Sequence, residues 1–154
     1  MNERWLVLDR KIQEDLGRID KIYEDLGEPA LEDGTARETV IVAAYRLHNL
    51  YSAFENIFRN IAAAFENHIG PDGWHRQLLQ RMRLDLTPLR PAVVDDEAYE
   101  KLDELLRFRH LFRTGYGVDL DPLRLHIVLV KALQLRPIYR HQIERFLEHV
   151  NSLE

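Results

Sequence analysis

The chain of 154 residues is long enough to bury one substantial core, and its 45% hydrophobic and 31% charged residues are typical of a soluble helical domain. The lack of cysteine excludes disulfides and thiolate metal sites, and the net charge of −5 is not that of a protein that coats nucleic acid non-specifically. No run approaches the ~18 apolar residues of a membrane span, and the N-terminus does not resemble a signal peptide. We therefore expect a single domain over residues 1–154 in the cytoplasm, without a membrane partner.

Apolar residues at spacings of three and four predict a first helix over residues 3–27, which Gly27 and Pro29 end. A second helix should run from the capping box Thr35-Ala-Arg-Glu38 to about Ile69. Its apolar residues form a heptad-like seam, which is typical of helices that pack nearly parallel to their neighbours: Val40, Ala44, Leu47, Tyr51, Phe54, Phe58, Ile61 and Phe65.

A shorter helix is predicted over residues 74–86, and an extended connector should follow it around Pro88 and Pro91. Asp95 is a good N-cap for a further helix over residues 96–114.

The last helix should begin with Asp121 as N-cap, followed by proline at the first helical position, and should run to about residue 150. Pro137 lies inside it and lacks a backbone N–H, so we expect a kink or a break there. Four long helices and one short helix with short connections predict an all-α, antiparallel up-and-down bundle.

The helix over residues 96–114 changes character towards its end. Its core-facing stripe begins with apolar side chains and then carries two guanidiniums and a phenol: Tyr99, Leu102, Leu106, Arg109, Arg113 and Tyr116. A guanidinium cannot shed its charge, so burying it requires a partner. Either a carboxylate lies opposite, or the helix end opens into a site for an anion. The simpler alternative is that the arginines extend into solvent, as cations often do in a last helical turn.

The second helix carries a polar line that offers such a carboxylate. Four residues share one side of the helix beside its apolar seam: His48, Ser52, Glu55 and Arg59. They form either a solvated flank or a site in which Glu55, supported by His48, pairs with Arg109 or Arg113. None of the seven histidines has the spacing of a zinc or di-iron site, so we expect neither a metal nor a cofactor.

The stretch Arg109-His-Leu-Phe-Arg-Thr114-Gly-Tyr116 resembles the signature of HEPN-domain proteins, and more narrowly that of the HepT-like toxins of prokaryotic toxin–antitoxin pairs. Their motif is an Arg, then usually a small polar residue or His, then a His after four intervening residues, then x-Tyr. The resemblance extends to Leu-His-Asn-Leu-Tyr-Ser-Ala-Phe-Glu-Asn-Ile-Phe in the second helix and to Trp74-His75 with Leu78-Leu79 in the short one. It implies a HEPN-like bundle over most of the chain.

The resemblance implies a homodimeric, metal-independent RNA endonuclease whose composite cleft forms where two motif helices meet. In it Arg109 would bind the scissile phosphate, Arg113 would assist, and a His would handle a proton. The motif His is here Thr114, whose hydroxyl can hydrogen-bond a phosphate but is not an acid or base near neutrality. Either His110 substitutes for it, or cleavage is weak, or the chain has kept the fold and lost the cleavage.

The resemblance also implies a silencing partner, a nucleotidyltransferase antitoxin that transfers AMP to the motif tyrosine. Tyr116 occupies that position, between two glycines at a helix end, although it would serve equally as a plug for the end of the bundle. Two other functions stay open. The chain would be a catalytically inactive HEPN-type helical adaptor that binds a nucleotide, RNA or a partner protein, or a plain dimerisation module in which Glu55 and solvent satisfy the arginines.

Overall fold

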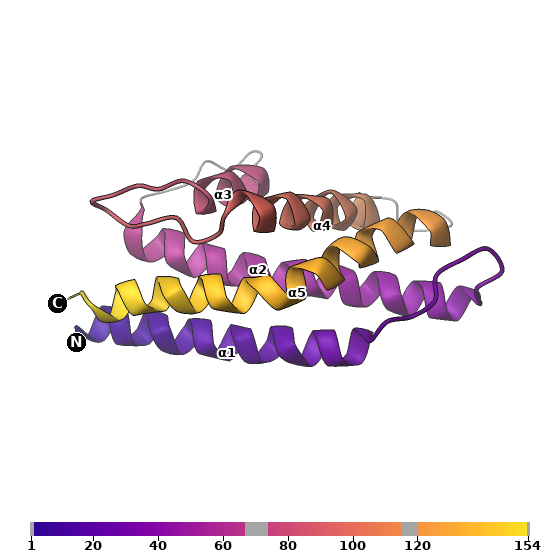
Figure 1. Ribbon diagram of the computed structural model, residues 1–154, viewed down its shortest axis with the longest axis horizontal. Coiled ribbons are helices and arrows are strands. Elements are labelled where there is room, and N and C mark those ends of the chain that lie inside the picture. Colours follow the sequence, from indigo (N-terminus) through magenta and orange to yellow (C-terminus); the bar gives the residue numbers. More distant parts are fainter. Residues whose placement is uncertain (1, 67–73, 115–119, 154) are drawn as a thin grey trace.

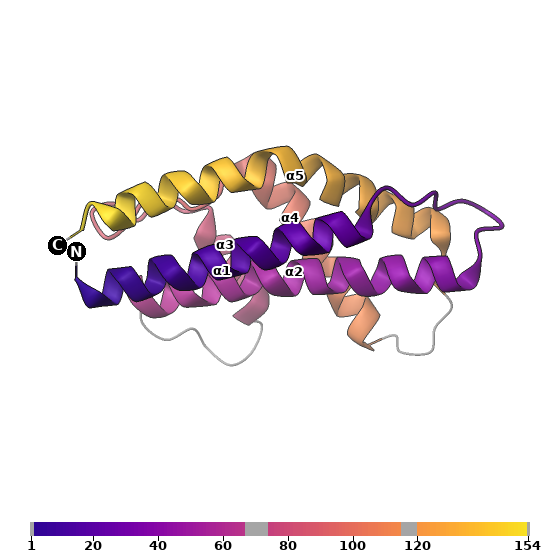
Figure 2. The ribbon, with the colours of Figure 1, turned by 90° about the horizontal axis from the view of Figure 1, so that it is seen from below.

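The computed structural model describes residues 2–66, 74–114 and 120–153. These residues form five helices and no strand, which confirms the predicted all-α bundle: α1 (Glu3–Leu26), α2 (Arg37–Phe65), α3 (Trp74–Met82), α4 (Asp96–Thr114) and α5 (Pro122–Asn151). Helices α1, α2 and α5 run up and down along the long axis, with α1 opposite in direction to α2 and α5 (Figure 1), whereas α4 crosses the bundle obliquely (Figure 2). No helix within these residues combines the length and the apolarity needed to cross a membrane.

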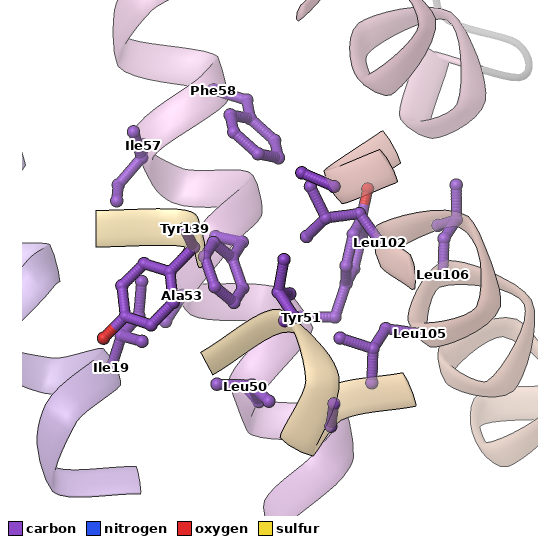
Figure 3. Close-up of a cluster of buried hydrophobic side chains, with 14 of the residues drawn as sticks. Ile19, Leu50, Tyr51, Ala53, Ile57, Phe58, Leu102, Leu105, Leu106 and Tyr139 are labelled. Carbon is purple, nitrogen blue, oxygen red and sulfur yellow. The ribbon is translucent and has the colours of Figure 1, made fainter. Parts of the chain in front are cut away.

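Helix α2 is the central element, because it packs against each of the other four helices. Its apolar seam is buried from Val40 to Ile61, as the heptad-like spacing predicted. Side chains from α1, α2, α4 and α5 form one continuous core, in which Ile19 of α1 lies near Tyr139 and the α4 leucines lie beside Tyr51 (Figure 3). Among the described residues, α1 makes no contact with α3 or α4, so α2 separates the α1 side of the bundle from the α3–α4 side.

The capping box predicted at the start of α2 is wrong. Thr35 Oγ1 accepts a hydrogen bond from the Glu32 N–H at 2.9 Å and donates to the Ala30 carbonyl at 3.2 Å. The hydroxyl thereby closes the preceding loop, and α2 begins after Ala36 without a side-chain cap. At its other end α2 stops at Phe65, earlier than predicted, and the predicted last turn continues into residues outside those the structure describes.

Helix α3 ends at Met82, also earlier than predicted, because a buried arginine binds the chain that follows it. Arg90 is fully buried and its guanidinium pairs with the carboxylate of Glu66. The same guanidinium donates to the carbonyls of Arg81 at 3.0 Å and Leu84 at 3.3 Å. These bonds satisfy carbonyls that a longer helix would have used and fix the connector against the end of α2.

The predicted caps of α4 and α5 are present. Asp95 accepts a hydrogen bond from the Ala98 N–H at 2.8 Å, and Asp121 accepts one from the Leu123 N–H at 3.0 Å. Helix α5 is continuous through Pro137, and Figure 2 shows it arched about its middle, so the proline bends the helix without breaking it.

Helix α5 contacts both α1 and α4. Lys131 reaches Glu100 of α4 at 2.5 Å. The Tyr139 hydroxyl donates to Asp20 of α1 at 2.7 Å. The Tyr23 hydroxyl of α1 donates to the Ala132 carbonyl at 2.7 Å. Helix α5 therefore joins the two sides of the bundle that α2 separates.

Candidate active site

A polar cluster lies in the middle of α2, beneath α3 and α4. Its centre is Glu55, which is only 4% exposed. Arg109 reaches it from α4, with Nη1 at 3.5 Å from Glu55 Oε1, and the Arg109 side chain is 13% exposed. Arg109 Nε also donates to Ser52 Oγ at 3.2 Å. Of the two interpretations of this helix face, a solvated flank and a pair between Glu55 and a motif arginine, the structure shows the second, with Arg109 as the arginine.

A third helix contributes to the same cluster. His75, in the first turn of α3, has its Nδ1 at 2.8 Å from Glu55 Oε2. Nη1 of Arg109 lies at 3.3 Å from the same nitrogen. The two oxygens of one carboxylate thus serve a guanidinium from α4 and an imidazole from α3. Because the imidazole is 30% exposed, the cluster reaches the molecular surface at His75.

The floor of the cluster is fixed by α2 itself. Ser52 accepts from Arg109 and donates to the His48 carbonyl at 3.1 Å, so its hydroxyl orientation is determined. The His48 ring is half-buried and packs against Phe112 of α4, with centroids 5.2 Å apart. Burial, with the neighbouring charge of Glu55, raises the pKa of the Tyr51 hydroxyl, so that this phenol stays neutral.

Aromatic and charged side chains hold α3 in place around the imidazole. The ring of Trp74 lies against that of His75, with centroids 3.6 Å apart, and the Arg59 guanidinium lies 5.4 Å from the Trp74 centroid. Arg76 of α3 pairs with Asp103 of α4 at 2.9 Å. Helix α3 is therefore fixed to both α2 and α4, which limits how far His75 can move from Glu55.

The cluster combines a permanent cation, a buried carboxylate and an imidazole. Such a set can bind an anion through the guanidinium and transfer a proton through the imidazole near neutral pH. Across residues 2–66, 74–114 and 120–153, no three His, Asp or Glu side chains gather closely enough to hold a metal ion.

A family model for HepT-like proteins matches residues 42–150, which include most of α2 and all of α3 and α4. The chain belongs to the HepT-like family. No curated protein and no solved structure matches it. The matched range contains every member of the cluster around Glu55, so the cluster is part of the HepT-like, HEPN-type portion of the chain.

Of the other polar residues of the HepT-like motif, the structure describes the side chain of His110 alone. His110 is exposed and, as the residue after Arg109, projects about 100° around α4 from it. The side chains of Arg113 and Thr114, and Tyr116 as a whole, lie outside what the structure describes.

In the sequence, His75 was noted only as part of the resemblance to HepT-like proteins and was not identified as a site residue. It precedes the buried Leu78 and Leu79 by three and four residues, which places it on the inward face of a short helix. An imidazole on a buried face needs a hydrogen-bonding partner. That spacing, together with the second oxygen of the Glu55 carboxylate on α2, was the signal that could have identified it.

Proposed function

We propose that this chain is the HepT-like toxin of a toxin–antitoxin pair and that it acts as a metal-independent RNA endonuclease in the cytoplasm. The observation that carries the proposal is the state of Arg109, a 13% exposed cation held by Glu55 and Ser52 at the end of an otherwise apolar helix face. A guanidinium held in this way presents its remaining N–H groups in a fixed direction, which suits the tetrahedral oxygens of a phosphate.

Cleavage of RNA without a metal requires a cation that stabilises the charge on the phosphorane. Arg109 would supply it, with Arg113 assisting from the next turn of α4. Thr114 and His110 would line the same cleft, Thr114 as a hydrogen-bond donor to phosphate oxygens. The net charge of −5 suits an enzyme that binds RNA at one local basic site and not over its whole surface.

The experiment that tests this is RNA cleavage by the purified protein, free of any nucleotide adduct, in excess chelator. Arg109→Ala should lower the rate roughly 10²–10³-fold, which is typical of removing one donor to a developing oxyanion. The matched control is Arg107→Ala, because Arg107 is 62% exposed on the same helix and pairs with Asp103. Equal rates for the two variants would refute the role of Arg109, and an inactive wild type would refute the endonuclease.

A homodimer with a composite cleft is part of the proposal. Three large apolar side chains near the end of α4 and the start of α5 are about half exposed, as expected of residues that a second copy covers: Leu111, Leu123 and Ile127. Sedimentation at micromolar concentration should show a dimer. Leu111→Asp should shift it towards monomer, whereas Leu84→Asp, at a similarly exposed leucine beyond the end of α3, should not.

The proposed silencing step is AMP transfer to Tyr116 by a nucleotidyltransferase antitoxin. The support is its position in the sequence, two residues after the end of the helix that carries Arg109. A bulky anionic adduct there would compete with RNA for the guanidinium. Co-expression with the partner should add one AMP in the intact-mass spectrum, and Tyr116→Phe should abolish the addition. An adduct that maps to another residue would refute this step.

A second function is favoured by Thr114, which replaces the motif His. A catalytically inactive HEPN-type adaptor would keep the phosphate-binding arginine and bind RNA, a nucleotide or a partner protein without cleaving it. Its signature in the same experiment is RNA binding that depends on Arg109 while the RNA stays intact.

A further inference from the structure

The hydrogen bonds of His75 determine which of its nitrogens carries a proton. Nδ1 lies 2.8 Å from the Glu55 carboxylate and 3.3 Å from Nη1 of Arg109. A guanidinium has only donors and a carboxylate only acceptors, so Nδ1 can satisfy just one of them. The shorter contact is to the charged acceptor, and bonds to ionised groups are the stronger class. Neutral His75 therefore carries its proton on Nδ1 and donates it to Glu55.

That tautomer leaves the lone pair of the ring on Nε2, on the opposite side of the imidazole from Glu55. A carboxylate that fixes one ring nitrogen and frees the other is how proteins prepare an imidazole to accept a proton. The ring is held further by its contact with Trp74 and is 30% exposed, so a substrate can reach it.

We propose that His75 is the general base of the RNA cleavage, in place of the imidazole that Thr114 lacks. This inference rests on the endonuclease function proposed above. Nε2 takes the proton of the ribose 2′-hydroxyl while that oxygen forms a bond to phosphorus. The bond from phosphorus to the 5′-oxygen breaks, and the leaving oxygen takes a proton from water. The products are a 2′,3′-cyclic phosphate and a 5′-hydroxyl, and the imidazolium returns its proton to solvent.

The shared Glu55 carboxylate determines which role each residue of the cluster has. Oε1 of Glu55 faces Arg109 and Oε2 faces His75, so one side chain sets the spacing between the phosphate-binding group and the base. Glu55 is a positioning residue in this scheme, and His75 and Arg109 are the catalytic residues. His110 lies one residue beyond Arg109 on α4 and is exposed, so its imidazole is the competing candidate.

The first test compares wild type, His75→Gln and His110→Gln in the RNA cleavage assay with chelator, after circular dichroism has shown that each variant is folded. His75→Gln should lower kcat roughly 10²–10⁴-fold with little change in KM, since a general base contributes about that factor. It should also remove the acid limb of the kcat profile against pH, which loss of a merely structural contact would not do. His110→Gln should retain the acid limb, because His110 lines the cleft without accepting the proton, whatever the change does to RNA binding.

The failures of the two proposals are distinguishable. An inactive wild type overturns the endonuclease function and the base role together. An active wild type whose rate and acid limb survive in His75→Gln overturns the base role alone, and loss of both in His110→Gln assigns the base to the exposed imidazole.

A second measurement needs neither activity nor a variant. Long-range proton–nitrogen correlation spectra of histidine-labelled wild type should show the Nδ1–H tautomer for neutral His75. Uridine 3′-monophosphate should move its Nε2 resonance, whereas uridine, which lacks the phosphate, should not. An Nε2–H tautomer, or an Nε2 resonance that ignores the nucleotide, would overturn the assignment even if His75→Gln fails to fold.

Discussion

Substitution of Glu55 by alanine should destabilise the bundle by about 3 kcal/mol. The carboxylate is 5% exposed and the Arg109 side chain 13% exposed, so the substitution leaves a guanidinium largely excluded from water without its counter-charge. Removing one partner of a buried ion pair typically costs about 3–5 kcal/mol. The 3.5 Å separation and the residual exposure of Arg109 place this pair at the lower end of that range.

The assay is urea unfolding followed by far-UV circular dichroism, together with a thermal scan. For a chain of this size, about 3 kcal/mol corresponds to a melting temperature lower by about 6–12 °C. The matched control is Glu14→Ala, which breaks an exposed ion pair between side chains that are 70% and 58% exposed. Exposed pairs of this kind contribute about 0–1 kcal/mol, so the control should unfold close to wild type.

A double variant separates the charge effect from lost packing. When Glu55→Met and Arg109→Met are combined, no buried charge is left without a partner, so the double variant should lose much less stability than the two single variants added together. Additive losses would refute the reasoning, as would a Glu55→Ala variant as stable as the Glu14→Ala control. Either result would mean that solvent and Ser52 are enough to satisfy the guanidinium.

Three further substitutions test other parts of the structure. Glu66→Ala should cost about 3–5 kcal/mol in urea unfolding, because it leaves the fully buried Arg90 without its carboxylate. Asp121→Ala removes the N-cap of α5 and should cost about 1 kcal/mol in the same assay. The hydrogen bond from Arg140 lowers the pKa of Asp20 below the ordinary 3.8. Its stabilisation is therefore complete above about that pH and is lost as the pH falls below it, so Asp20→Asn should flatten the acid end of the stability profile. Because both side chains are partly exposed, that difference should stay under about 1 kcal/mol, and a larger loss at neutral pH would contradict this explanation.

Local rules predicted the helices well, and contacts between distant residues account for what they missed. The N-caps at Asp95 and Asp121 depend on residues a few positions away, so the sequence alone identifies them. Thr35 looked like a cap by the same rule, but its hydroxyl binds Ala30 and Glu32 in a loop whose path local spacing does not determine.

In the candidate site, too, local sequence rules predicted some features, and contacts between distant residues determined the others. The helical period placed Arg109 on the inward face of its helix and Glu55 beside the seam of another. Whether they meet depends on the order and rotation of the helices in the bundle, and the helical periodicity of the sequence does not determine either. His75 was missed because its partners are 20 and 34 residues distant in the chain.

The separation of α1 from α3 and α4 has a consequence for how the molecule opens. Among the described residues, α1 is joined to α3 and α4 only through α2 and α5. Helices α3 and α4 can therefore detach while the contacts of α1 with α2 and α5 remain. In native-state hydrogen exchange, loss of the Glu55 carboxylate should therefore release amides of α3 and α4 and leave those of α1 protected. Helix α1 also precedes the range that the HepT-like family model matches, which begins at residue 42. Given these helix contacts, we expect α3 and α4 to open as one cooperative unit, and α1, with the parts of α2 and α5 that contact it, to open as another.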